Sequence, residues 1–231
     1  MNNTIKNIKY NNIEFKYIIN NNDRSGIGCI NEIINNDEYK LFKFANKNGI
    51  FIDIGGNHGL VTIILAIQNP NATIYVLEPH PDLIEIIKNN IEINNIKNVI
   101  VINKALGDGN NVKLHMSNKW SGATSILVED TNKFSKNYNG YKEIEVKTIS
   151  FDNLLKKNKI NEIELLKIDC EGGEYYLYDS ILFKKNCVKN ITGEFHNLSY
   201  NLQKPNWNTK DLTNYVKKYV LGDINLSYLT I

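Results

Sequence analysis

The amino-acid sequence predicts an α/β fold, namely a doubly wound, mostly parallel sheet that carries an N-terminal extension. From residue 50 onward, short β-branched runs alternate with helical patterns, the order expected of strands joined by crossover helices. The strands are apolar throughout, which is typical of a parallel sheet covered by helices on both faces. The length of 231 residues suits one domain with a small appendage.

The elements follow one another in a regular order. The expected strands are residues 50–54, 72–77, 99–103, 164–169, 188–195 and 224–231. The expected helices include residues 60–68, 82–94 and 209–219. In the second of these helices, Leu83, Ile86, Ile87 and Ile91 recur at helical spacing and form an amphipathic stripe. The strand at 224–231 is the one clear strand expected after the helix at 209–219. The prediction therefore leaves the strands at that edge of the sheet undecided.

Two further regions flank these elements. Residues 1–48 are expected to form an extension, with strands at 5–10 and 13–19 and a helix around 30–46, packed on a main domain of residues 49–231. Residues 107–158 form an insert with expected strands at 112–116 and 143–148 and a helix at 151–157. Its middle, residues 117–141, is polar and long for a connection, which favours a functional or a mobile segment over a structural one. Trp120 in this stretch lines a binding pocket or belongs to a surface loop.

Composition argues against several classes of protein. A formal net charge of +2 with scattered lysines predicts no basic face for nucleic acid. No apolar run approaches the ~18 residues of a membrane helix, and the first residues lack the apolar stretch of a secretory signal. Three cysteines without metal-ligand spacing argue against a disulfide framework. We therefore expect a cytoplasmic protein with no nucleic-acid or membrane partner.

The first expected strand ends in a glycine-rich loop, Asp53-Ile54-Gly55-Gly56-Asn57-His58-Gly59. Glycines let the backbone turn sharply and approach a ligand, and such a loop lies at the ligand-binding edge of a parallel sheet. The loop lacks the G-x-G-x-x-G fingerprint of dinucleotide enzymes. It has instead an acid at the strand end, which balances a positively charged ligand such as S-adenosylmethionine.

A second acid, Glu78, ends the next strand and is followed by Pro79. An acid roughly 20 residues beyond a glycine loop commonly accepts hydrogen bonds from ribose hydroxyls. The alternative is a carboxylate that stabilises the N-terminus of the following helix. Together with Asp53, this position favours a nucleoside-containing cofactor.

Acids and one histidine gather after the fourth and fifth strands. Asp169, Glu171 and Glu174 follow the fourth strand, and Glu194 and His196 end the fifth. Transfer of a methyl group to a hydroxyl requires loss of the hydroxyl proton, which a histidine or a carboxylate can accept. The same residues could instead hold a divalent cation, and this ligand set suits Mg²⁺ or Mn²⁺ better than Zn²⁺. The candidate catalytic residues are Glu171, Glu194 and His196, and which of them is the base stays open.

The sequence resembles the FkbM family of S-adenosylmethionine-dependent methyltransferases. The stretches that carry the resemblance are FIDIGGNHG (51–59), LEPHP (77–81), KALGD (104–108), TISFDNLL (148–155), LLKIDCEGGE (165–174) and ITGEFH (191–196). They follow one another over residues 50–196, and the segment around Asp169 is the most specific of them.

The resemblance implies a Rossmann-like class I methyltransferase fold, S-adenosylmethionine as cofactor, and O-methylation of a small-molecule or glycan hydroxyl, with a sugar favoured. The cofactor residues implied by the motifs, together with the neighbouring Gly56 and Pro79, are Asp53, Gly55, Gly56, Asn57, Gly59, Glu78, Pro79, Ala105, Leu106 and Asp169. In this assignment Glu78 binds the ribose, Ala105 and Leu106 lie near the adenine, and Asp169 closes the site. Two alternatives are a nucleic-acid base methyltransferase, whose proline-containing motif is missing after the fourth strand, and a non-catalytic cofactor-binding scaffold.

Overall fold

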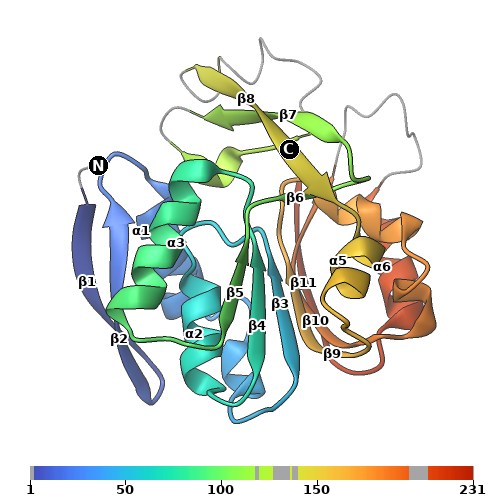
Figure 1. The fold of residues 1–231 in the computed structure, drawn as a ribbon, viewed down its shortest axis with the longest axis horizontal. Coiled ribbons are helices and arrows are strands. Elements are labelled where there is room, and N and C mark those ends of the chain that lie inside the picture. Colours follow the sequence, from blue (N-terminus) through green and yellow to red (C-terminus); the bar gives the residue numbers. More distant parts are fainter. Residues whose placement is uncertain (1–2, 118–119, 127–135, 137–139, 198–207, 231) are drawn as a thin grey trace.

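The computed structural model describes residues 3–117, 120–126, 136, 140–197 and 208–230. Its centre is a six-stranded sheet with the spatial order β11 (Ile224–Thr230), β10 (Val188–Asn197), β9 (Ile163–Ile168), β3 (Ile50–Ile54), β4 (Thr73–Leu77) and β5 (Val99–Ile102). Every neighbouring pair in this sheet runs parallel. This order confirms the predicted doubly wound sheet (Figure 1). The edge that the prediction left undecided is formed by β11, which pairs with β10. Ile231, the last residue of the predicted strand, lies outside the described residues.

Helical segments cover both faces of the sheet and create two cores. The helices α2 (Leu60–Gln68) and α3 (Pro81–Ile93) lie on one face, and α5 (Phe151–Lys157), α6 (Thr209–Tyr219) and the 3₁₀ segments η4 (Gly173–Asp179) and η5 (Phe183–Lys185) lie on the other (Figure 1). Because side chains alternate along a strand, Phe51 of β3 packs into the α2 core while Ile52 and Ile54 pack into the opposite one.

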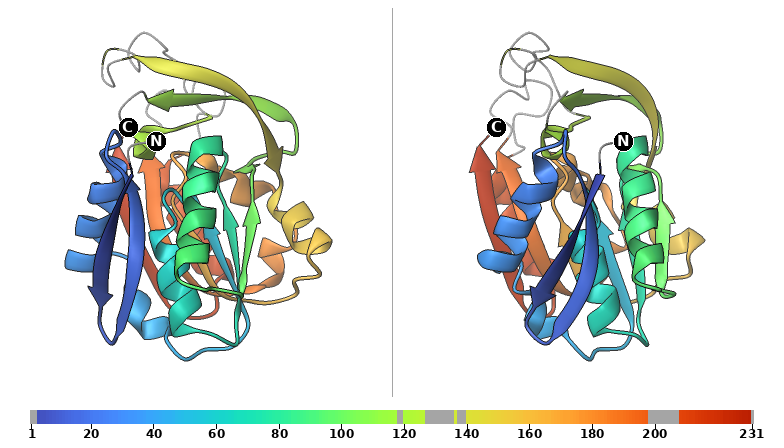
Figure 2. Two further views of the ribbon diagram at one scale, coloured as in Figure 1. Left: turned by 60° about the vertical axis from the view of Figure 1, so that its left-hand side comes forward. Right: turned by 90° about the vertical axis from the view of Figure 1, so that its left-hand side faces the viewer.

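The insert forms a small sheet of its own. Its strands β6 (Ala105–Leu106), β8 (Tyr141–Ile149) and β7 (Asn111–Ser117) are neighbours in that order, and the short 3₁₀ helix η3 (Ser121–Ala123) follows β7. The two strands expected in this region are confirmed. Figures 1 and 2 show β7 and β8 lying across the end of the large sheet at which its strands finish.

The N-terminal residues form an antiparallel hairpin of β1 (Asn3–Tyr10) and β2 (Ile13–Asn20), as predicted. Asn90 of α3 and Asn94, which directly follows the helix, dock this hairpin. The buried Asn90 accepts a hydrogen bond from the Ile18 amide at 2.7 Å and donates one to the His58 carbonyl at 3.0 Å. Asn94 accepts from the Lys16 amide at 2.9 Å and donates to its carbonyl at 2.7 Å. The hairpin also shares a core with α2, and Asn90 links it to the glycine loop.

The helix expected at residues 30–46 is wrong in its bounds. Helical backbone begins earlier, in α1 (Ser25–Cys29), and continues as a π-helix, η1 (Ile30–Asn35), before it stops. Asp37 and Lys40 then take left-handed φ values of 48° and 52°, which a helix cannot contain. A 3₁₀ turn, η2 (Leu41–Phe44), completes the segment.

Within the described ranges, no helix has the length and apolar character needed to cross a membrane.

Candidate active site

The site lies where the order of the strands reverses. The chain runs from β3 outward to β5 and then returns to place β9 on the other side of β3. The loops that follow β3 and β9 therefore face each other across the carboxyl ends of two adjacent strands. In open α/β sheets this switch point is where ligands bind.

Glycine at position 55 is required by the close approach of these two loops. Gly55 has φ of +81°, and a Cβ atom there would lie 1.8 Å from the backbone oxygen of Asp169. The amides of Gly55 and Gly56 both donate to the Leu77 carbonyl at 3.0 Å. Gly59, with φ of +86°, is the N-cap of α2. The loop is thus a rigid turn between three strand ends.

One cavity opens at this point and collects most of the predicted site residues. Those that line it are Gly55, Gly56, Asn57, Glu78, Pro79, Ala105, Leu106, Asp169, Glu171 and Glu194. Asp53, Gly59 and His196 are absent from the lining in the described part of the chain. These three residues can therefore influence a bound ligand only through the residues around them.

Asp53 is buried beneath the glycine loop with Lys167, a residue that the sequence analysis did not single out. Its carboxylate accepts a hydrogen bond from the Thr62 hydroxyl at 2.6 Å and lies 3.3 Å from the Lys167 ammonium. Lys167 in turn donates to the Gly55 carbonyl at 2.7 Å. Burial raises the pKa of Asp53 even though Lys167 lowers it. The positive partner of Asp53 in the fold is therefore Lys167, and the pair supports the loop from below.

Glu78 orients the loop and lines the cavity at the same time. Its two carboxylate oxygens accept hydrogen bonds from the amides of Asn57 and His80, each at 2.8 Å. Burial raises its pKa to about 7, and these two amides oppose that rise. Both interpretations offered from the sequence are thus compatible with the geometry, because each carboxylate oxygen has a further lone pair for a ligand.

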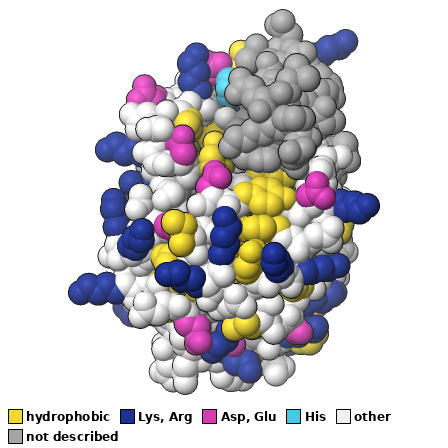
Figure 3. All heavy atoms as spheres, turned by 90° about the vertical axis from the view of Figure 1, so that its right-hand side faces the viewer, with side chains coloured by type: hydrophobic (Ala, Val, Ile, Leu, Met, Phe, Trp, Pro, Cys, Tyr) yellow, Lys and Arg dark blue, Asp and Glu magenta, His cyan; other side chains and the backbone are white. Residues whose placement is uncertain are grey.

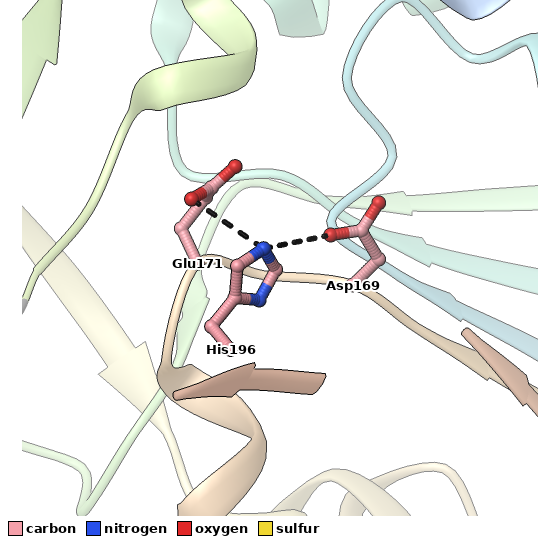
Figure 4. Close-up of side chains that lie close together, drawn as sticks. All are labelled: Asp169, Glu171 and His196. Atoms are coloured by element: carbon pink, nitrogen blue, oxygen red, sulfur yellow. Dashed lines mark ion pairs between the residues drawn. The ribbon is translucent and has the colours of Figure 1, made fainter. Parts of the chain in front are cut away.

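His196 is surrounded by carboxylates. Its Nδ1 lies 2.7 Å from Glu174, and its Nε2 lies 3.6 Å from Glu171 and 3.9 Å from Asp169 (Figure 4). Burial alone lowers the pKa of His196, but Glu174 and then the other two carboxylates raise it to about 10. At neutral pH the ring is therefore a buried imidazolium. A cation of this kind orders the cluster but cannot accept a proton.

Two of the carboxylates that line the cavity, Glu171 and Glu194, differ in their partners. Glu171 faces the imidazolium, and burial raises its pKa to about 8 although His196 lowers it. Glu194 has no hydrogen bond or ion pair with any other described residue, and burial followed by Asp169 raises its pKa to about 7. Glu194 is thus the carboxylate whose basicity suits proton removal near neutral pH.

Three side chains could also serve as metal ligands. Ligand atoms of Asp169, Glu171 and His196 lie within 4.8 Å of one another, and the side chains point toward a common centre (Figure 4). Glu174 on the other ring nitrogen resembles the outer partner that metal-bound histidines usually have. In the structure the imidazolium itself supplies the positive charge at that centre.

The insert and the extension close the cavity from above. Trp120, Ser121, Gly122 and Thr124 contribute to the lining, although Trp120 is 48% exposed. The amides of Ser121 and Gly122 donate to the side chains of Asp23 and Ser25, at 3.0 and 2.6 Å. The extension also lines the cavity with one helical face and a tyrosine, a group that comprises Gly28, Cys29, Glu32, Ile33 and Tyr39.

His58 of the glycine loop is fully buried. Its Nδ1 lies 2.6 Å from the Asn57 side chain, and its Nε2 lies 3.6 Å from Asp23 of the extension. Burial lowers its pKa to about 4, so the ring is neutral. His58 is therefore a structural link between the glycine loop and the extension.

Known proteins resemble the chain at the levels of sequence and fold. Methyltransferase 1 from Beauveria bassiana (strain ARSEF 2860) is 28% identical over 149 residues, an alignment that covers 59% of this chain and 59% of that protein. TYW2 of M. jannaschii in complex with AdoMet is 25% identical, with a TM-score of 0.30 and coverage of 43% of this chain and 42% of that one. An rRNA methylase from Streptococcus thermophilus is 12% identical, with a TM-score of 0.43 and coverage of 80% and 78%. At these TM-scores the structural likenesses carry no argument about substrate.

A family model gives the decisive comparison. The model described as the methyltransferase FkbM domain matches residues 53–220, which is well over half of the chain. The match includes both loops of the switch point and all of the carboxylates around His196. It agrees with the resemblance carried by the sequence motifs. The chain therefore belongs to the FkbM family of methyltransferases.

Proposed function

We propose that the protein is an S-adenosylmethionine-dependent O-methyltransferase that acts on a hydroxyl of a small molecule or glycan, with a sugar hydroxyl favoured. The observation that carries this proposal is a single cavity at the switch point. It combines the strand-end acid Glu78 and the glycine loop with Glu194, a carboxylate that has no hydrogen bond or ion pair to another described residue.

In this proposal the cofactor lies along the lining residues. Asn57 and Gly55 contact its methionine part, Glu78 accepts hydrogen bonds from the ribose, and Ala105 and Leu106 lie against the adenine. Asp53 has an indirect role, because it is fully buried and paired with Lys167. It keeps the loop in place rather than contacting the ligand.

The protein contributes proton transfer and charge. When bound, S-adenosylmethionine supplies an electrophilic methyl group on its sulfonium. Glu194 would accept the proton of the acceptor hydroxyl, so that this oxygen could take up the methyl group that the bound cofactor would supply. The ring of His196 lies beside Glu171 and Asp169 and holds both side chains in position. Among the three candidate catalytic residues, this proposal therefore makes Glu194 the base.

The acidic lining disfavours a nucleic-acid acceptor. Glu78, Asp169, Glu171 and Glu194 line the cavity together with only two described lysines, Lys104 and Lys167, and such a wall repels a phosphate backbone. On the face shown in Figure 3, lysines and arginines are spread among acidic and apolar side chains rather than gathered in one patch. The intact carboxylate cluster likewise favours an enzyme over a cofactor-binding scaffold.

Binding of the cofactor is the first test of the proposal. We expect calorimetry to show that the wild-type protein binds S-adenosylhomocysteine with one site, and that Glu78→Gln weakens binding about 100-fold, the loss of about 2.7 kcal/mol expected when two charge-assisted hydrogen bonds are impaired. The matched control is Glu85→Gln on the exposed face of α3, where the carboxylate pairs with Lys88. Absence of binding by the folded wild-type protein would refute the proposed function.

A second test concerns the divalent cation. We propose that the site works without one, because His196 already places a positive charge among Asp169, Glu171 and Glu174. Electron paramagnetic resonance of Mn²⁺ added to chelator-treated protein is expected to show no stoichiometric site below the millimolar range, with or without S-adenosylhomocysteine. A tight site that disappears in Glu171→Gln would show that these residues hold a metal.

A further inference from the structure

Tyr39 belongs to the N-terminal extension, yet its hydroxyl reaches the centre of the site. It donates a hydrogen bond of 2.7 Å to Oδ2 of Asp169, a residue 130 positions later in the chain. The side chain is only 4% exposed and lines the cavity. Its ring also lies 5.3 Å from the Lys167 ammonium. The phenol is therefore part of the wall that a bound ligand would meet.

The segment that carries Tyr39 is fixed by several elements of the main domain. The Tyr39 carbonyl accepts a hydrogen bond from the Thr192 hydroxyl of β10 at 3.0 Å. The carbonyl of the preceding residue, Glu38, accepts one from the Asn225 side chain of β11 at 2.8 Å. On the other side, the Tyr10 hydroxyl donates to Asp37 at 2.6 Å. The position of the phenol is thus determined before any ligand binds.

This hydroxyl fixes the orientation of the Asp169 carboxylate. Two cationic neighbours of this carboxylate are farther away, with Lys167 at 3.9 Å from Oδ2 and His196 at 3.9 Å from Oδ1. Only the phenol is within hydrogen-bonding distance of an Asp169 side-chain oxygen among the described residues. Without it, the carboxylate would be free to turn toward either cation.

We propose that Tyr39 is a positioning residue that holds Asp169 in its ligand-binding orientation, so that the N-terminal extension is a working part of the methyl-donor site. Residues 1–48 precede the family match, which begins at residue 53, and the extension therefore adds to the site a group that the family match does not include. The inference rests on the proposed function, because it assumes that Asp169 contacts the cofactor. Burial and Asp169 raise the pKa of Tyr39 well above its usual value, so the phenol remains a donor over the working pH range.

The test compares Tyr39→Phe with Tyr215→Phe by calorimetry with S-adenosylhomocysteine. Tyr215 is a matched control, since its hydroxyl also donates one hydrogen bond, to the Leu177 carbonyl, but on the far face of the sheet. We expect Tyr39→Phe to weaken binding about tenfold, the order that loss of one charge-assisted hydrogen bond gives. Tyr215→Phe is expected to leave affinity unchanged, and both variants are expected to keep a similar melting temperature.

A double-mutant cycle with Asp169→Asn separates positioning from general structural support. If the phenol acts through Asp169, the double variant binds no more weakly than Asp169→Asn alone. Additive losses, or wild-type affinity in Tyr39→Phe, would overturn the inference while leaving the proposed function intact. Absence of binding by the wild-type protein would overturn both, so the two failures are distinguishable.

Discussion

Replacing Glu194 with Gln is expected to lower turnover by about 10²–10⁴-fold, the usual contribution of a general base, which corresponds to about 2.7–5.4 kcal/mol of activation free energy. The amide keeps the size of the side chain but cannot accept the hydroxyl proton. Because Glu194 forms no hydrogen bond or ion pair with another described residue, its removal should disturb no hydrogen bond there. The measurement is transfer of a labelled methyl group to the hydroxyl acceptor on which the wild-type protein is active.

The pH dependence gives an independent signature of the same residue. Burial and Asp169 raise the pKa of Glu194 to about 7. The ionised form is the active base, so kcat/KM for the acceptor should rise with pH until about 7 and then level off. This rising limb should be missing in Glu194→Gln, whose residual activity depends on pH only through other groups.

Two comparisons make the result specific. Glu164→Gln alters a half-buried carboxylate at the opposite end of β9, where it pairs with Lys189, and should retain nearly full turnover. Affinity of Glu194→Gln for S-adenosylhomocysteine should change less than threefold, because the carboxylate acts on the acceptor. An equal loss of affinity and turnover would instead assign Glu194 to cofactor binding.

The main sheet was predictable from sequence because its elements are encoded locally. The run at residues 50–54 and the helix at 60–68 agree with β3 and α2 to the residue. Buried parallel strands are apolar throughout, and the helices between them keep a clear period, so both signals survive in a single sequence. The helix at 30–46 was wrong because left-handed residues at Asp37 and Lys40 interrupt it, and no pattern in the chain marks them.

The sequence predicted which residues gather at the site but not which of them contact one another. Strand-end positions correctly brought Glu78, Asp169 and Glu194 to one cavity, since parallel strands end at one edge. Which charged side chains pair with one another depends on their distances in the folded protein. The spacing of residues along the sequence does not reveal those distances. Asp53 was therefore expected at the ligand although it is paired with Lys167, and Tyr39 was missed because its partner is 130 residues away.

The pairing of Lys167 with Asp53 leads to the second large prediction. We expect Lys167→Met to lower the free energy of unfolding by about 3–5 kcal/mol, the range observed when one partner of a buried ion pair is removed. The side chains are only 4% and 0% exposed, so water cannot replace the lost charge. The Gly55 carbonyl loses its hydrogen bond in the same variant. Urea unfolding at several pH values measures the effect.

The pH dependence of that loss identifies its cause. Burial already raises the pKa of Asp53, and removing the ammonium raises it further. The folded variant then binds a proton that the unfolded chain releases above about pH 4, so its stability relative to wild type falls as pH rises. Adding Asp53→Asn should restore much of the loss and remove this pH dependence, because no uncompensated carboxylate remains.

Lys189→Met is the control that separates burial from pairing. Lys189 also contacts two carboxylates, Glu162 at 2.7 Å and Glu164 at 3.2 Å, but its side chain is 39% exposed. Solvent screens exposed pairs of this kind, and they contribute little to stability, so this variant should unfold almost as the wild type does. Similar losses in the two variants would mean that burial of Asp53 does not determine the effect. A large loss confined to Lys167→Met would show that the glycine loop depends on a buried charge pair beneath it.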